Sequence, residues 1–334
     1  MSRICIVPRV EGSGGMASFR LKFEVGLHAR GVDVTHDLSE PSDAVLVIAG
    51  TKNLLPLWRA KCRGLRIVQR LDGINWVQRA RWTGPHYHLR AEYGNAMLSF
   101  IRAHFADCVI YQSQFIRGWW EKWYGPTRVP ARVIHNSVDL NIYSPARAIP
   151  SFPPYRLLVV EGSLAGGLDT GLRASVRLAE ILNEKFPMEL LIAGRVDAAK
   201  QNELTRKSRV PIRFLGVVPR EQIPDLDRSS HLLFSAEINP PCPNSVIEAL
   251  ACGLPVVGFD TGSFRELVSD EAGHSAPYGG DPWKLDPPDV PALAKAAEEV
   301  LNNQARFRQA ARARAEAAFG LDKMVDEYLN ALLG

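Results

Sequence analysis

The chain has 334 residues, of which 46% are hydrophobic and 23% charged, with 40 Lys and Arg against 36 Asp and Glu. This length favours two domains, and the composition is that of a globular protein rather than a fibrous or disordered one. The five Cys are scattered without a CxxC pair, which favours reduced thiols and argues against a disulfide scaffold or a zinc site. Strand-like residues begin by Arg3, so we expect no signal peptide, and no apolar run reaches the ~20 residues of a membrane helix. We therefore expect a cytoplasmic protein.

Charge and tryptophan are divided unevenly along the chain. Residues 1–150 hold 20 Lys and Arg and 11 Asp and Glu, whereas residues 151–334 hold 20 and 25. Six of the seven Trp lie between Trp58 and Trp123. A basic, Trp-rich first half and an acidic second half predict two domains with different partners.

The first half alternates short apolar runs with amphipathic stretches. The apolar runs predict strands at 3–8, 32–36, 44–50, 65–70, 108–112 and 132–136. The amphipathic stretches predict helices at 17–30, 86–106 and 113–124. Such an alternation is typical of a parallel sheet that helices cover on both faces.

The same alternation restarts after a Pro-rich segment at 144–156, which has no periodicity and is predicted to be a linker. Strands are predicted at 156–162, 189–194, 213–218, 231–236 and 255–260, and helices near 170–183 and 244–252. The tail 292–332 is helical in pattern, with a break at 320–322. We therefore predict an α/β chain with two doubly wound parallel-sheet domains, 1–145 and 146–315, followed by a helix at 316–334.

Two loops that lead from a predicted strand into a predicted helix are candidate ligand-binding sites. Gly14 and Gly15 follow the first strand, so their backbone N–H groups could cradle an anion, or they could form a tight turn without a ligand. In the second half, the stretch 235–268 passes from a strand through a Pro-bounded loop into a short helix. Asn244 or Ser245 is predicted to cap that helix, so that its first amides face the loop.

Glu248 lies one turn into this otherwise apolar helix. Burying a carboxylate costs free energy unless a partner hydrogen-bonds it. The hydroxyl pair of a sugar or ribose is one suitable partner, and a neighbouring backbone N–H is the alternative.

The stretch CPNSVIEALACGLPVVGFDTG (242–262) resembles the signature of family 4 (group 1) retaining glycosyltransferases of the GT-B fold. Other pieces follow in the family's order: GSGGMASF, RVIHNSVDLNIYSP, LLVVEGS and RFLGVVPREQ. The resemblance implies two Rossmann-like domains that face a central cleft, and a final helix that crosses back to the first domain. It also implies retaining transfer from a nucleotide-diphosphate sugar to a glycan, lipid-linked or small-molecule acceptor, as in polysaccharide biosynthesis, with no cofactor and no metal.

The resemblance assigns donor-binding roles to residues of this chain. Glu248 matches the glutamate that is expected to hold the donor ribose. The other donor-binding residues that it implies are Gly14, Gly15, Gly162, Ser163, Gly166, Gly167, Asn244, Ser245 and Val246.

Two departures from the family's pattern concern the donor site. Pro240 stands where the family has a first glutamate, and the nearest carboxylate is Glu237, with Asn239 the nearest amide. The loop EGSLAGGLDTG (161–171) lacks the family's Arg and Lys, so Arg195 is the best remaining cation for a leaving diphosphate. Glu237 and Arg195 are therefore expected among the catalytic groups. The alternatives are a catalytically impaired nucleotide- or sugar-binding protein and a nucleotide-sugar epimerase.

Asp72 is the candidate catalytic residue of the first domain. It follows a strand in QRLDGINW (69–76), near the place where many family members carry a His. Its carboxylate could orient an acceptor hydroxyl, or it could form an Asx-type turn with Gly73.

The segment 58–132 is basic and aromatic, with 13 Lys and Arg against 4 Asp and Glu. Its last helix carries two adjacent aromatic stripes, whereas a helix that faces a core needs only one. This pattern predicts peripheral contact with the inner face of a membrane, or else rings that pack on the sheet. No nucleic-acid motif accompanies the charge, so we expect no nucleic-acid partner.

Overall fold

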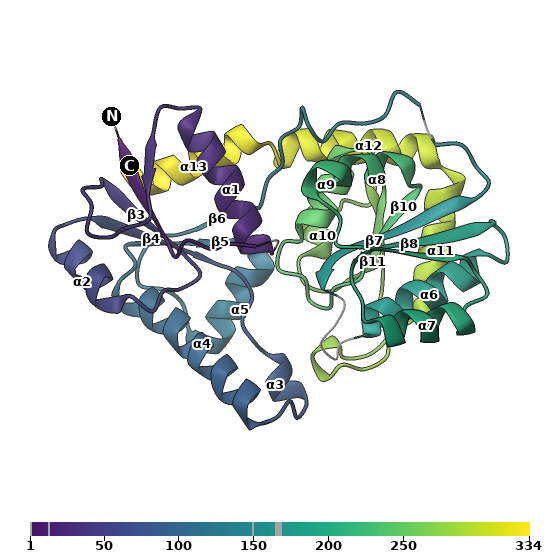
Figure 1. Ribbon diagram of the computed structural model, residues 1–334, viewed down its shortest axis with the longest axis horizontal. Helices are drawn as coiled ribbons and strands as arrows, with labels where there is room; N and C mark the ends of the chain where they lie inside the picture. The colour runs from purple at the N-terminus through teal and green to yellow at the C-terminus, as the bar shows by residue number, and fades with distance from the viewer. Residues whose placement is uncertain (1, 13, 149, 164–168) are drawn as a thin grey trace. The chain divides into compact units, whose positions relative to one another are not determined.

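The computed structural model describes residues 2–12, 14–148, 150–163 and 169–334 (Figure 1). The chain divides into two compact units, one of Met1–Ser137 with Leu321–Gly334 and the other of Val138–Gly320. Each unit is built on one six-stranded sheet, and every strand pair in both sheets is parallel. The predicted α/β class with two doubly wound parallel sheets is thereby confirmed.

The sheet of the first unit has the order β2-β1-β3-β4-β5-β6. Its strands are β1 (Arg3–Val7), β2 (Asp33–Thr35), β3 (Ala44–Ile48), β4 (Arg66–Leu71), β5 (Cys108–Tyr111) and β6 (Ala131–Val133). Its helices are α1 (Gly15–His28), α2 (Leu54–Cys62), α3 (Val77–Ala80), α4 (Pro85–His104), α5 (Gln114–Tyr124) and α13 (Leu321–Leu333). The strand order reverses between β1 and β3, so a ligand crevice is expected beyond the carboxyl ends of these two strands.

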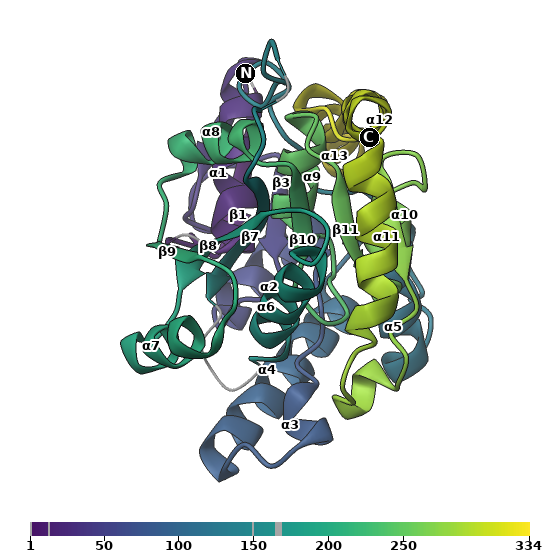
Figure 2. The same cartoon turned by 90° about the vertical axis from the view of Figure 1, so that its right-hand side faces the viewer.

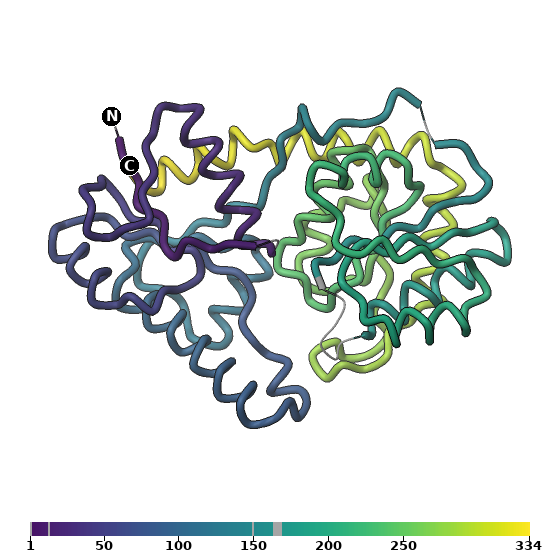
Figure 3. Tube along the Cα trace, in the orientation of Figure 1, coloured from purple at the N-terminus to yellow at the C-terminus, as the bar shows by residue number. Residues whose placement is uncertain are grey.

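Helices α1 and α13 share one face of this sheet. The rings of Phe19 and Phe23 on α1 lie 5.1 Å and 5.2 Å from the ring of Tyr328 on α13. Gly26 permits this close packing, because a Cβ at that position would overlap Val325 of α13. The last helix therefore belongs to the core of the first unit, and both ends of the chain lie in that unit (Figure 3).

The sheet of the second unit has the order β12-β11-β10-β7-β8-β9. Its strands are β7 (Tyr155–Ser163), β8 (Met188–Arg195), β9 (Ile212–Gly216), β10 (Leu232–Ser235), β11 (Val256–Phe259) and β12 (Gly273–Ala276). Its α-helices are α6 (Thr170–Leu182), α7 (Ala198–Lys207), α8 (Ile223–Ser229), α9 (Asn244–Ala251), α10 (Phe264–Leu267), α11 (Val290–Asn302) and α12 (Gln304–Ala318). This order reverses between β7 and β10, which marks the ligand crevice of this sheet.

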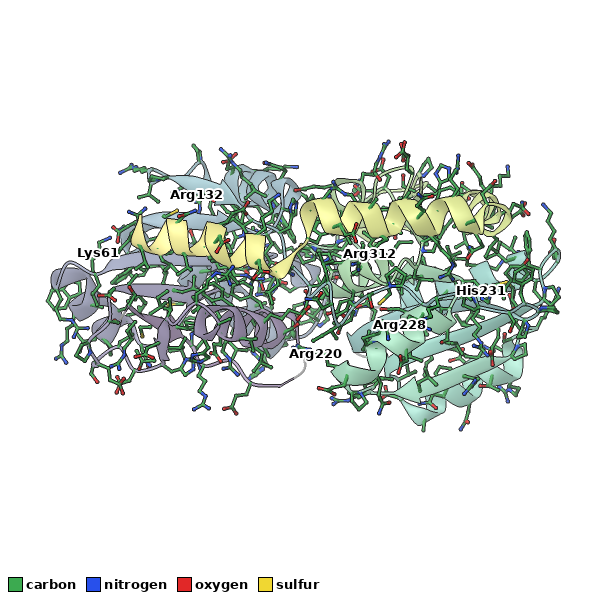
Figure 4. All side chains as sticks on the ribbon, turned by 90° about the horizontal axis from the view of Figure 1, so that it is seen from above. Lys61, Arg132, Arg220, Arg228, His231 and Arg312 are labelled. Atoms are coloured by element: carbon green, nitrogen blue, oxygen red, sulfur yellow. The ribbon has the colours of Figure 1, made fainter. Side chains whose placement is uncertain are left out.

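Two hydrophobic cores lie on opposite faces of the second sheet. One joins α6 and α11 to the sheet, and α11 runs along the front of this unit in Figure 2. The other contains α9 and α12 together with Val138 and Tyr143. Arg312 of α12 donates hydrogen bonds to the carbonyls of Tyr143 and Ala251, both at 2.8 Å (Figure 4). The residues directly before the Pro-rich segment are therefore packed into the second unit.

Both aromatic stripes of α5 are packed rather than presented to solvent. Trp119 and Trp120 are 5% and 0% exposed, and the guanidinium of Arg79 covers the ring of Trp123 at 4.3 Å. The interpretation of this helix as an exposed aromatic surface is therefore wrong, because the sheet takes one stripe and neighbouring side chains cover the other. Of the helices described here, none has the length and apolar character required to span a bilayer.

Candidate functional site

The carboxyl ends of β7 and β10 bring Glu161 and Glu237 together. The two strands pair at Leu157 with Leu232 and Leu158 with Leu233, so their ends are neighbours at the point where the strand order reverses. Glu161 is half-buried, and its pKa is raised to about 8, first by loss of hydration and then by the charge of Glu237. The Glu161 carboxyl is therefore largely protonated at neutral pH and can donate a hydrogen bond.

Sequence reasoning missed Glu161. The available signal was an acid that ends an apolar strand, in RLLVVEG, directly before a glycine-rich loop. Glu237 stands 76 positions further along the chain, so the two carboxyls become neighbours only through the pairing of β7 with β10.

Cations gather at the same end of the sheet. Arg195 pairs in register with Ser163, is exposed, and forms no ion pair with any residue in the described part of the chain. Lys200 at the start of α7 lies 2.7 Å from the carboxylate of Asp169, which precedes α6. Lys200 was not expected from the sequence, and it supplies a second cation beside the loop that lacks the family's Arg and Lys.

The loop between β7 and α6 holds several of the expected donor-binding residues. Gly162 is exposed, with open space where a side chain would project. Gly166 and Gly167 lie outside the described residues, as does the side chain of Ser163, and their roles stay predictions.

Helix α9 begins without a side-chain cap. Its N-cap residue is Pro243, and Asn244 and Ser245 already lie inside the helix, so the prediction that one of them caps it is wrong. Proline carries no side-chain acceptor, and its fixed φ of −66° suits the entry to a helix. The N-cap residue therefore offers no side-chain acceptor to the first amides of the helix, those of Asn244, Ser245 and Val246.

The loop before α9 is shaped by close backbone packing on Pro240. Gly262 has φ +59°, and a Cβ there would overlap the backbone of Pro240. The N–H of Ser263 donates to the carbonyl of Pro240 at 2.9 Å. Asn239 has a left-handed backbone with φ +53°, is 4% exposed, and its Nδ2 has no hydrogen-bond partner among the described residues. An unpaired amide thus lies next to the proline that replaces the family's glutamate.

The start of α6 is pressed against the end of β10. A Cβ on Gly171 would overlap the carbonyl oxygen of Ala236, the residue before Glu237. Glycine at this position lets the helix approach the strand closely, and so fixes the two sides of the β7–β10 crevice relative to each other.

Glu248 lies in a buried acidic cluster with Asp227 of α8 and Tyr143. Glu248 and Asp227 are 7% and 1% exposed. Burial, and then the charge of Glu248, raise the pKa of Asp227 well above its usual range, which favours its protonated form. Arg228 holds this region by donating to the carbonyls of Ser144 and Ile142 at 2.7 Å and 2.8 Å (Figure 4).

The candidate residues of the first unit lie on two loops of its sheet. Gly14 is the N-cap of α1, which has no side-chain cap, and Gly15 is its first residue. Asp72 follows β4, and burial raises its pKa while the charge of Arg70 opposes that shift. The indole N–H of Trp120 donates to the Asp72 carbonyl at 2.8 Å, which fixes the backbone at this position.

The structure therefore brings Glu237, Arg195 and Gly162 to one edge of the second sheet, where the start of α9 also lies. Gly14, Gly15 and Asp72 belong to the first unit. Among the described residues, no group of three or more His, Cys, Asp or Glu side chains is arranged to hold a metal ion.

Comparison with known proteins identifies relatives of this chain. Residues 157–303 match the model of a family described as Glycosyl transferases group 1. A phosphatidyl-myo-inositol mannosyltransferase of Mycobacterium tuberculosis is 29% identical over 177 residues, which are 49% of this chain and 42% of that protein. The chain thus aligns with less than half the length of the curated relatives that it matches.

Solved structures resemble nearly the whole chain. Sucrose-phosphate synthase from Thermosynechococcus elongatus has a TM-score of 0.75 at 16% identity, with 99% of this chain and 98% of that chain covered. Anabaena Alr3699/HepE in complex with UDP has a TM-score of 0.71 at 15% identity, with 99% of each chain covered. At these identities the likeness concerns the fold, and it confirms the predicted GT-B architecture.

Proposed function

We propose that the protein transfers a sugar from a nucleotide-diphosphate donor to an acceptor hydroxyl, because residues 157–303 match the model of the group 1 glycosyl transferases. One observation carries the proposal: the uncapped start of α9 lies at the reversal point of the second sheet, beside Glu161, Glu237 and Arg195. A helix start of this kind binds anions through its free N–H groups and its dipole. The Anabaena protein of similar fold has been solved with UDP and with UDP-glucose, which supports a donor of this class.

The donor nucleotide is bound by the second unit in this proposal. The amides of Asn244, Ser245 and Val246 hold the diphosphate. Glu248 accepts hydrogen bonds from the ribose hydroxyls, and its charge adds to burial in raising the pKa of the neighbouring Asp227 carboxyl. The unpaired Asn239 amide donates to a hydroxyl of the donor sugar, in the role that the missing glutamate leaves open.

The leaving diphosphate needs positive charge and hydrogen-bond donors as the glycosidic bond breaks. Arg195 supplies the charge, since no carboxylate in the described residues occupies its guanidinium. Lys200 adds to the local positive potential, although Asp169 shares its charge. The protonated carboxyl of Glu161 can donate to a phosphate oxygen, which an ionised carboxylate would repel.

We propose that transfer retains the anomeric configuration and uses no metal or cofactor, as the family resemblance implies. The leaving phosphate then takes the acceptor proton on the same face of the sugar. Glu237 and Asp72 position the donor sugar and the acceptor, a glycan, a lipid-linked sugar or a small molecule, and neither forms a covalent bond to the sugar. The raised pKa of Asp72 is consistent with a carboxyl that has lost part of its hydration.

The test is to incubate the full chain with UDP- and GDP-sugars and to measure release of the nucleoside diphosphate. Proton NMR of the product gives the anomeric configuration, and retention is expected. Glu237→Gln should lower turnover, whereas Glu184→Gln, an exposed position at the end of α6, should not. Nucleotide binding without any turnover would establish a binding protein instead, and an inverted product would overturn the proposed mechanism.

A further inference from the structure

Large apolar side chains are exposed in one part of the first unit. Of the fourteen exposed large hydrophobic residues in the described chain, seven fall on or beside α2, α3 and α4. They are Leu55, Trp58, Trp82, Tyr87, Leu89, Tyr93 and Phe100. Five of the seven are aromatic, although the Trp-rich helix α5 nearby buries Trp119 and Trp120.

Helix α4 is apolar on its solvent side. Ala91, Asn95 and Ile101 are buried and face the sheet. Leu89, Tyr93 and Phe100 fall at i, i+4 and i+11, which places them together on the opposite side of the helix. They are 70%, 58% and 44% exposed, and of the three only Phe100 has its ring against neighbouring rings, those of His104 and Phe105, among the contacts described.

Helix α2 extends the exposed surface. It packs on the sheet beside α4, and its Lys61 donates a hydrogen bond to the Phe105 carbonyl at the end of α4 at 2.7 Å (Figure 4). Its outer side carries Leu55 and Trp58, which are 55% and 53% exposed. Figure 1 shows α2 and α4 on the same side of the sheet, opposite α1 and α13. We name the outer residues Leu55, Trp58, Leu89, Tyr93 and Phe100 the apolar face.

The surroundings of the apolar face are strongly basic. Residues 52–104 contain ten Lys and Arg but only two acids, Asp72 and Glu92. Glu92 is already paired, since the Arg79 guanidinium lies 2.7 Å from it. Four exposed arginines near the apolar face form no ion pair with any described residue, namely Arg59, Arg63, Arg81 and Arg90.

We propose that the apolar face binds an anionic phospholipid bilayer. Trp58 and Tyr93 suit the headgroup level, Leu89 and Phe100 the acyl boundary below it, and the four arginines the lipid phosphates. A second copy of this chain fits less well, because a two-fold interface would place these unpaired arginines opposite themselves. An uncharged bilayer would leave them without counter-charges. The site lies wholly in the first unit and is independent of donor binding by the second.

The test is co-sedimentation of the full chain with vesicles, either of phosphatidylcholine alone or of phosphatidylcholine with phosphatidylglycerol. We expect binding only to the anionic vesicles, and less of it at high salt. Leu89→Gln, Tyr93→Gln and Phe100→Gln together should reduce partitioning about ten-fold or more. Arg81→Gln and Arg90→Gln should each reduce it about five-fold.

A matched control is Leu21→Gln with Val25→Gln on α1, whose side chains are 41% and 64% exposed on the opposite face of the sheet. This pair should bind vesicles like the wild type. Thermal unfolding and nucleotide binding should be unchanged in every variant, which separates this proposal from the donor site. Equal binding by the apolar-face triple variant, no binding of the wild type to anionic vesicles, or a dimer that the triple variant dissociates would each overturn the proposal.

Discussion

Glu161 and Glu237 end adjacent parallel strands of the second unit, and the charge of Glu237 adds to burial in raising the pKa of Glu161 to about 8. A carboxyl that keeps its proton at neutral pH can donate a hydrogen bond to an anion, which an ionised carboxylate cannot do. Glu161 is therefore suited to contact a phosphate at the reversal point of the sheet.

Replacing Glu161 should change how stability depends on pH. In the unfolded chain this carboxyl ionises near its ordinary pKa of 4.5, whereas in the folded chain it keeps its proton to about 8. Stability should therefore fall as the pH rises between these values, by about 2 kcal/mol once partial exposure is allowed for. Urea unfolding of Glu161→Gln at several pH values should lack this decline. The exposed Glu184→Gln should keep it, and a decline of equal size in both variants would refute the assignment.

Gly171→Ala should destabilise the protein. The added Cβ overlaps the carbonyl oxygen of Ala236, and the helix must move away from the strand to relieve the contact. Overpacking of this kind costs about 1–3 kcal/mol, which a urea midpoint measures readily. Gly118→Ala in α5 is the matched control, since open space surrounds its α-carbon and alanine favours a helix, so it should be neutral or stabilising. Equal midpoints for Gly171→Ala and the wild type would show that α6 adjusts freely.

His231 should make the protein sensitive to acid. It is 0% exposed, accepts from the Arg156 N–H at 3.0 Å, and burial lowers its pKa to about 4. Between pH 6.5 and that value the unfolded chain binds a proton that the native chain excludes, so stability falls as the pH falls, by about 3 kcal/mol in total. His231→Asn keeps an acceptor without the titration, and should flatten this part of the stability curve.

The matched control for His231 is the exposed His28 on α1. His28→Asn should leave the acid limb of the curve as in the wild type. If His231→Asn and the wild type lose the same stability between neutral and acidic pH, the loss arises at other groups.

Arg195→Gln should lower turnover far more than stability. Its guanidinium is exposed and forms no ion pair in the described chain, so we expect the free energy of unfolding to change little. Loss of one positioned donor to a developing negative charge typically costs 10²–10³ in turnover. Steady-state release of nucleoside diphosphate measures this, with Arg206→Gln on the exposed side of α7 as the control. Unchanged turnover would mean that Lys200 or backbone amides alone stabilise the leaving group.

The sequence allowed the strands, most helices and the two-sheet architecture to be predicted, because alternation and hydrophobic period are local signals. Relationships across the sheet were not predictable. Glu161 lies near Glu237, and Lys200 near Asp169, only because the fold places β7 beside β10 and α7 beside the start of α6. The cap of α9 was assigned one or two residues too far along, because the N-cap position is held by Pro243, which provides no side-chain acceptor. For the Trp residues of α5 the sequence left two alternatives, a membrane surface and packing on the sheet, and Trp119 and Trp120 are buried. Exposed aromatic residues lie on α2 and α4 instead, where composition alone did not separate inner from outer sides.

The proposed transfer requires that the second unit bind a nucleoside diphosphate through Glu248 and the start of α9. Isothermal titration of UDP and GDP into the full chain tests it most directly. We predict that one of the two binds, and that Glu248→Gln weakens it about ten-fold or more, since a hydrogen bond to a charged group contributes ~1.5–3 kcal/mol. Glu184→Gln should bind like the wild type. Binding of neither nucleotide, or equal affinity in Glu248→Gln, would contradict the account.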